Sequence, residues 1–266
     1  MRLNIGWTIS LLTLSWVCSA AAKTRVHHAA TGVFEHNDAA DSAAYRWRRE
    51  VRRDMVGFND EEKDAMLDRH NSLRSVEFAS DMMRMDWDTD LEKSAQVWAD
   101  KCIFGHSPDR QVEKYRYVGE NLYAGTNEFD PAHVVQLWYD EKVDYNYDSL
   151  RCTPGKMCGH YTQVVWANSR AVGCGVRYCP FLQQASQFGF SKGYNVVCHY
   201  GPGGNYVGQK PYIRGFGCSN CPDDAQYCGE NLCYRTFLFQ SAHTARPMVW
   251  VQVLSCVLLL LLQRRA

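Results

Sequence analysis

The stretch GHYTQVVWANS, residues 159–169, decides the fold. It places His160 before a short apolar run of strand-forming residues, 164–166, and it ends in an Asn-Ser turn. A strand so short and apolar is typical of a buried position. We therefore expect a strand at residues 164–166 with His160 at its mouth, where a functional site can be built.

The same stretch resembles the first signature of the CAP superfamily (cysteine-rich secretory proteins, antigen 5, pathogenesis-related 1). Residues 197–206, VCHYGPGGNY, resemble the second signature of that family. The two matches occur in order and at a suitable separation, so the resemblance covers roughly residues 60–235. The order of domain, cysteine-rich hinge and apolar tail resembles the peptidase-inhibitor and glioma-pathogenesis-related branches.

Composition and cysteines bound the class of protein. The 266 residues carry 29 acidic and 29 basic side chains, a balance that gives no global attraction to nucleic acid. Of twelve cysteines, ten lie between Cys102 and Cys233. Behind a secretory leader, an even set predicts five disulfides made in an oxidising compartment. Structural zinc is the alternative, because Cys218 and Cys221 have ligand spacing.

Three helices are predicted from caps and periodicity. Asn59 or Asp60 caps the first helix, and a second helix follows Thr89-Asp90. Asp130 followed by proline starts the third helix, whose inward stripe includes Glu141. The inner face of the first helix contains Met66, Leu67, His70 and Leu73, and that of the second contains Leu91, Ala95, Trp98, Ala99 and Cys102.

Residues 173–179 and 194–200 are predicted to be strands, with a loop at 152–158. Helices lie on both sides of these strands in the sequence. We therefore expect an α+β fold, a three-layer α-β-α sandwich, which is also the fold that the CAP resemblance implies. The short segment 213–235 cannot bury a core of its own and is predicted to be a disulfide-held hinge.

The predicted organisation is a signal peptide (1–22), a disordered pro-segment (23–58), the CAP domain (59–212), the hinge (213–235), a linker (236–247) and a hydrophobic tail (248–266). The basic run at 46–49 is either a solvated stretch or a furin-type processing site. The tail is either a GPI signal with attachment at Ser241-Ala242 or a short membrane span. At ~1.5 Å per residue its fifteen-residue stretch 248–262, nearly all apolar, extends only about 23 Å. These features predict a secreted protein or one anchored to the extracellular face of the plasma membrane.

The family resemblance implies a pairing for the cysteines, which spacing alone does not determine. It pairs Cys102 with Cys179, Cys174 with Cys198, Cys152 with Cys158, Cys218 with Cys228 and Cys221 with Cys233.

The resemblance also implies a cavity lined by four residues: His106, Glu120, Glu141 and His160. Two imidazoles suit zinc or another divalent cation, with His106 and His160 as ligands and the carboxylates binding outer-shell water. Alternatively, a carboxylate serves as a general base toward water. Read singly, each of the four is an ordinary hydrogen-bonded histidine or acid.

Two functions from different classes follow. The first is an extracellular protein that acts by binding a divalent cation, a lipid or sterol, or a protein partner such as a protease, with no catalysis. The second is a zinc-dependent hydrolase or protease that uses the four cavity residues. A structural matrix module with a vestigial cavity is a third reading. No acyl-transfer motif surrounds Ser107, and neither His133 nor His199 is assigned any chemistry.

Overall fold

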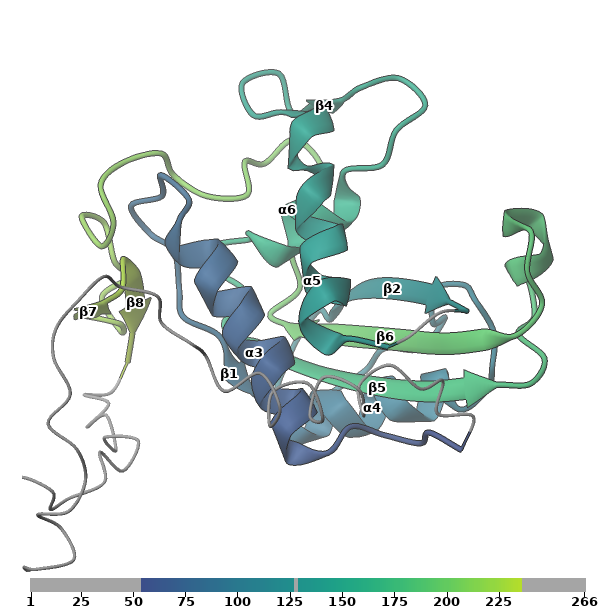
Figure 1. The fold of residues 1–266 in the computed structure, drawn as a ribbon. Coiled ribbons are helices and arrows are strands. Elements are labelled where there is room, and N and C mark those ends of the chain that lie inside the picture. Colours follow the sequence, from purple (N-terminus) through teal and green to yellow (C-terminus); the bar gives the residue numbers. More distant parts are fainter. Residues whose placement is uncertain (1–53, 127–128, 236–266) are drawn as a thin grey trace, which may run out of the picture. The chain divides into compact units, whose positions relative to one another are not determined.

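The computed structural model describes residues 54–126 and 129–235 (Figure 1). The predicted signal peptide, the segment 23–53, the linker and the hydrophobic tail lie outside the described residues. Within the described part of the chain, none of the helices has the length and apolarity needed to cross a bilayer.

A four-stranded sheet forms the middle layer. Its strand order is β1 (Asp86–Trp87), β5 (Ala171–Cys179), β6 (Gly193–Gly201) and β2 (Gly119–Gly125). The central strands β5 and β6 are the two predicted strands; every residue of β6 is buried, as befits a strand covered on both faces. Strands β5, β6 and β2 are antiparallel, and β1 runs parallel to β5. Strand β2 is an edge of the sheet, and the site is built around this edge.

Helices cover both faces of the sheet, which confirms the predicted α-β-α sandwich (Figure 1). Helix α4 (Thr89–Ala99) packs on one face, and α3 (Asp60–Ser75), α5 (Pro131–Asp140) and α6 (Gly159–Val164) lie on the other. Gly173 permits the close approach of α4, because a Cβ there would lie 2.2 Å from the backbone nitrogen of Glu92. A side chain at this position would therefore push α4 off the sheet.

The predicted helix starts agree with the structure. Asn59 caps α3 in a capping box with Glu62. Asp130 caps α5, whose first residue is Pro131. Helix α4 begins at Thr89 and is capped by Asp88, one residue before the predicted dipeptide.

The prediction for the opening stretch is wrong in one respect, because residues 159–164 form the short helix α6 and residues 164–166 are not a strand. Periodicity could not separate the two, since Tyr161, Thr162, Gln163 and Val164 are all buried. A helix this short has few internal hydrogen bonds, and a carboxylate from a distant part of the chain accepts from its first-turn amides. The first-turn amides of His160 and Tyr161 both donate to Glu141, at 3.0 and 3.2 Å.

The chain beyond α6 is held by Arg74 of α3. This side chain is fully buried and donates six hydrogen bonds of 2.6 to 3.1 Å to backbone carbonyl oxygens. Burial lowers the pKa of Arg74 to about 9. The acceptors belong to Met83, Val164, Trp166, Ala167 and Ser169.

Five disulfides join the described chain in the five pairs that the resemblance implies. Cys174 and Cys198 are direct partners in the β5–β6 ladder, and Cys102–Cys179 ties the segment after α4 to the end of β5. Each long closure contributes ~2–4 kcal/mol by restricting the unfolded chain.

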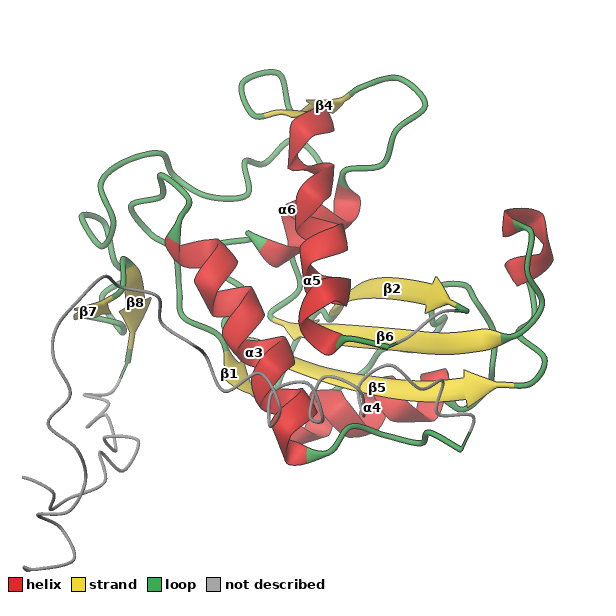
Figure 2. Cartoon of the chain, in the orientation of Figure 1, coloured by secondary structure: helices red, strands yellow, loops and turns green. Residues whose placement is uncertain are grey.

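The remaining elements are short (Figure 2). The first group comprises η1 (Glu141–Asp144), β3 (Tyr145–Asn146), β4 (Arg151–Cys152) and η2 (Ala185–Phe188), and the hinge forms β7 (Tyr227–Gly229) and β8 (Leu232–Tyr234). The hinge docks on the domain through its backbone. Cys233 donates to the carbonyl of Met82 and accepts from the amide of Arg84.

Residues just before the predicted domain start at 59 also pack against the domain. Met55 and Phe58 are buried in the core, and Val56 forms a bridge with Arg177 of β5.

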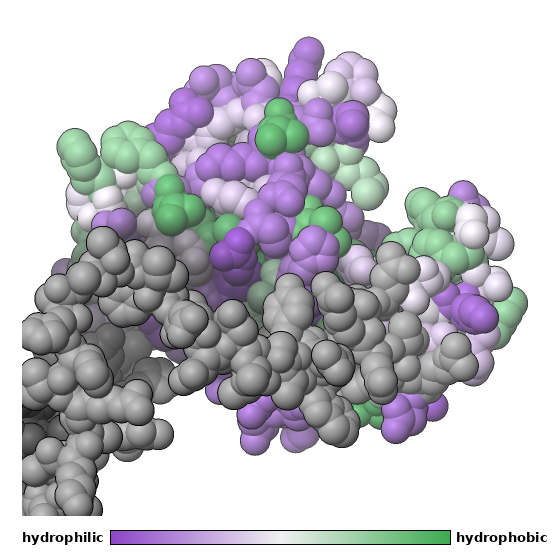
Figure 3. All heavy atoms as spheres, viewed as in Figure 1, coloured by the Kyte–Doolittle hydropathy of each residue, from purple (hydrophilic) through white to green (hydrophobic). Residues whose placement is uncertain are grey.

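Hydrophobic residues also reach the surface in separate patches, which Figure 3 shows on one face. Two are edge-to-face aromatic pairs with an exposed ring, Phe78–Phe216 and Phe104–Phe188.

Candidate functional site

The first half of the candidate site is the pair His106 and Glu120. Nδ1 of His106 lies 2.6 Å from Oε1 of Glu120, which is the second residue of β2. The imidazole is 64% exposed, whereas the carboxylate side chain is fully buried. The acid therefore fixes the ring from inside the domain, with Nε2 of His106 left free of hydrogen bonds within the described chain.

Glu120 is held in its ionised form by converging donors. Its oxygens also accept from the amide of Ser107, Nη1 of Arg110 at 3.0 Å and Nε2 of His199 at 3.1 Å. Burial alone would raise the pKa of Glu120. Hydrogen bonds from His106 and His199 and the charges of His199 and Arg110 outweigh it and lower that pKa to about 2. Glu120 is thus a carboxylate throughout the physiological range.

His199 is the site residue that sequence reasoning missed. It is fully buried, pairs directly with Glu120 across the β2–β6 ladder, and places Nδ1 3.1 Å from Oγ of Ser94 on α4. The sequence indicated His199 only through its position in the predicted strand 194–200. The partner strand β2 was not predicted. Without β2 no cross-strand neighbour could be assigned.

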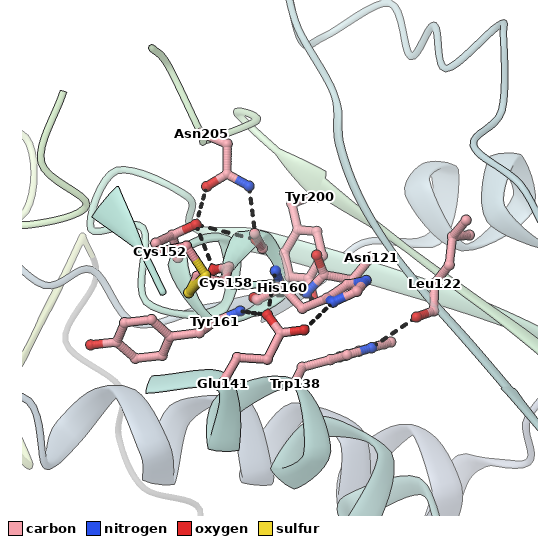
Figure 4. Close-up of polar contacts among 12 residues, drawn as sticks. Asn121, Leu122, Trp138, Glu141, Cys152, Cys158, His160, Tyr161, Tyr200 and Asn205 are labelled. Atoms are coloured by element: carbon pink, nitrogen blue, oxygen red, sulfur yellow. Dashed lines mark hydrogen bonds and ion pairs between the residues drawn. A yellow bond between two sulfur atoms is a disulfide. The ribbon is translucent and has the colours of Figure 1, made fainter. Parts of the chain in front are cut away.

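The second half is the pair His160 and Glu141 (Figure 4). Nδ1 of His160 lies 2.6 Å from Oε1 of Glu141, while Oε2 of the same acid caps α6 as described above. The ring of His160 stacks on Trp138 at 6.3 Å between centroids, and Trp138 is itself fixed by a hydrogen bond to the carbonyl of Leu122 on β2. Helix α5 and strand β2 therefore jointly orient this imidazole.

A buried chain of hydrogen bonds connects α3 to the backbone of His160. His70 donates from Nδ1 to the carbonyl of Met66 and accepts at Nε2 from the Tyr200 hydroxyl, at 2.7 and 2.9 Å. Burial lowers the pKa of His70 to about 4, so the ring is neutral, as this assignment requires. Asn121 donates to both the Tyr200 hydroxyl and the carbonyl of His160.

The two halves meet at strand β2. Glu120 contacts His106 and His199, whereas its neighbour Asn121 contacts His160 and Tyr200. Successive strand residues point to opposite faces of a sheet, so Glu120 supports the first half from one face of β2 and Asn121 supports the second half from the other face.

The two His–Glu pairs do not form a tight cage of ligand atoms. Among the described residues, Cys218, Cys221 and Cys233 form the one group of three or more candidate ligands whose atoms lie within 4.8 Å of one another. All three are in disulfides, which excludes the alternative of structural zinc on the cysteine pair of the hinge.

The donor chemistry of the two histidines nevertheless fits a divalent cation. In each, a carboxylate accepts from Nδ1–H, which fixes the tautomer and leaves the Nε2 lone pair available. This carboxylate–histidine arrangement is what metal-ligating imidazoles in proteins use. The carboxylates themselves are committed to the rings and to backbone amides, so we assign them to the outer shell.

The other sequence candidates lie outside this chemistry. Ser107 is buried, and its hydroxyl donates to the carbonyl of Asp109 and not to the neighbouring Glu120 or His106, so it is not arranged as a nucleophile with a base. His133 is exposed on α5. Tyr161, Val164 and Trp166, beside the signature, are buried in the packing of the domain.

The family model described as "Cysteine-rich secretory protein family", CAP, matches residues 67–200. Human GLIPR1-like protein 1 is 43% identical over 178 residues, covering 64% of this chain and 70% of that protein. Human peptidase inhibitor 16 is 40% identical over 177 residues, covering 65% of this chain but only 36% of that protein.

Among solved structures, one titled as NaASP2 with Zn²⁺ superposes with a TM-score of 0.50 at 27% identity. It covers 66% of this chain and 97% of that structure.

Proposed function

This chain belongs to the CAP family of cysteine-rich secretory proteins, and from that premise we propose that it is an extracellular binding protein whose two cavity imidazoles hold a divalent cation. His106 and His160 are the proposed ligands. The observation that carries the proposal is the repeated pair, in which each Nδ1 lies 2.6 Å from a carboxylate oxygen and each Nε2 is free within the described chain.

Zinc is the preferred candidate, because it binds imidazole nitrogen well, whereas cations such as Mg²⁺ prefer oxygen ligands. The solved relative titled with Zn²⁺ supports the same choice. A cation bound there would add positive charge to the site. Its remaining coordination positions would be available to an acidic group of a partner. The proposed partner is an extracellular protein or a lipid, and the proposed setting is outside the cell.

The residues behind the two imidazoles support binding over turnover. Glu120 receives at least four donors, and Glu141 receives two amides and a ring N–H. A general base needs an oxygen directed at water or substrate, and its pKa should lie near the working pH. The low pKa of Glu120, about 2, does not suit that role.

The experiment is calorimetric titration of the metal-stripped, disulfide-intact protein with Zn²⁺, Mn²⁺ and Mg²⁺. We expect zinc to bind, the single variants His106→Ala and His160→Ala to weaken it, and the double variant to abolish it. His133→Ala, on an exposed helix position, is the matched control and should bind as the wild type does.

Undiminished zinc binding by the double variant would overturn the proposed site. A zinc-dependent hydrolytic activity that the double variant loses would instead support the hydrolase alternative.

A further inference from the structure

The two imidazoles of the site differ in how they are held. The side chain of His160 is 20% exposed and stacks on Trp138, whereas that of His106 is 64% exposed. Within the described chain, the hydrogen bond from Nδ1 to Glu120 is the single polar contact that fixes the ring of His106. The orientation of His106 is therefore only as well defined as that of Glu120.

The two oxygens of Glu120 have different partners. Oε1 accepts from His106 and Arg110, with the Ser107 amide shared between both oxygens. His199 is the one side chain, in the described part of the molecule, that donates to Oε2. Loss of His199 would leave this buried oxygen with only the longer contact to the Ser107 amide, 3.3 Å, so the carboxylate would be held mainly through Oε1.

The ring of His199 is held on its other side by helix α4. Its Nδ1 meets Oγ of Ser94 at 3.1 Å, and α4 can bring Ser94 this close because Gly173, the β5 partner of His199, has no side chain. A continuous line of contacts thus runs from Ser94 on α4 through His199 and Glu120 to His106.

We propose that His199 is a positioning residue for the cavity: it fixes Glu120 from the buried side and so aims Nε2 of His106 at the bound ligand. It acts through Glu120, since its ring nitrogens contact Glu120 and Ser94. This inference rests on the proposed function, since it assigns to His106 the role of a ligand, but the orientation of His106 can be tested without any metal.

The first measurement is made on the metal-free protein. Nitrogen-15 NMR of the histidine rings reports which ring nitrogen carries the proton. In the wild type, His106 should be the Nδ1–H tautomer, because Glu120 accepts from that nitrogen. In His199→Leu we expect His106 to shift toward the tautomer mixture of a free imidazole. His199→Gln, whose amide can still donate to Glu120, should restore the Nδ1–H form.

His70→Leu is the matched control. His70 is as deeply buried as His199, but it connects to His160 through Tyr200 and Asn121. It should destabilise the fold without changing the tautomer of His106. If both leucine variants change His106 equally, His199 acts only through stability and the inference fails. It fails also if His106 keeps its tautomer in folded His199→Leu.

The second measurement is a double-variant cycle in zinc affinity. Partners that orient a metal ligand typically change affinity ~10–100-fold, so His199→Leu should weaken zinc binding by about tenfold. In a His106→Ala background the same change should cost nothing, whereas in a His160→Ala background the loss should persist. Equal losses in both backgrounds would contradict positioning through His106. If the wild type binds no zinc, the proposed function fails while the NMR result still decides the role of His199.

Discussion

Replacing Arg74 with methionine should lower the free energy of unfolding by about 4 kcal/mol. The guanidinium donates to five carbonyl oxygens, of which two also accept backbone amides, those of Trp166 and Ala167. The other three, from Met83, Val164 and Ser169, have no second donor within the described chain.

Each buried carbonyl left without a donor costs ~1–3 kcal/mol, so the three together cost roughly 3–9 kcal/mol. Removing the buried charge returns several kcal/mol of desolvation, so we expect a net loss in the lower half of that range, about 4 kcal/mol. Arg74→Lys keeps three donors, fewer than the guanidinium has, and should fall between the wild type and Arg74→Met.

The assay is equilibrium unfolding in urea, under conditions that keep the disulfides oxidised, followed by tryptophan fluorescence. Arg69→Met is the control, because Arg69 is on the same helix and, among the described residues, donates only to the side chain of Gln136. This change should cost less than about 1 kcal/mol. An Arg74→Met protein within 1 kcal/mol of the wild type would refute the reasoning.

Other predictions concern acid stability and packing. The folded pKa of His70, about 4, lies below its ordinary value of 6.5. Its contribution to the free energy of unfolding, up to ~3 kcal/mol, is therefore complete above pH 6.5 and is lost as pH falls toward 4. In a pH series of urea midpoints, His70→Gln should remove the pH dependence between these two values. Glu120, with a folded pKa of about 2 against 4.5, stabilises the fold above pH 4.5 and loses that contribution toward pH 2; Glu120→Gln should flatten this lower window. Gly173→Ala should cost ~3 kcal/mol by forcing α4 off the sheet, whereas Gly159→Ala, whose nearest contact is 3.9 Å, should cost under ~1 kcal/mol, as thermal melts can compare. Glu141→Gln removes one of two acceptor oxygens that cap α6 and hold its histidine, and should cost ~1–2 kcal/mol in the same melts.

Much of the fold could be predicted because its signals are local. The Asp130-Pro131 start and the capping box at Asn59 depend on neighbours three residues away, and the structure contains both. The stripe of Met66 and His70 on α3 also extends to Arg74, so helical spacing could have identified that buried arginine, although its charge argued for the surface.

The rest depended on contacts between distant parts of the chain. Residues 159–164 are helical because Glu141, some twenty positions earlier, caps them, and no local pattern records this. The link from Ser94 to His199 spans 105 positions and that from His199 to Glu120 spans 79. Such partners become neighbours only once strand β2 is paired with β6. The four residues of the two His–Glu pairs therefore came from family resemblance, and their supporting residues came from the structure.

The alternation of Glu120 and Asn121 along one edge strand has a consequence for any ligand that touches both imidazoles. Such a ligand is tethered twice, and its second attachment is favoured by the high effective concentration that a rigid spacer provides. Strand β2 is common to both halves here, because Glu120 holds the ring of His106 and Asn121 holds the backbone of His160. Inserting one residue into β2 would turn the side chains that follow it to the opposite face, and a ligand that touches both imidazoles would lose the shared support for its two attachments.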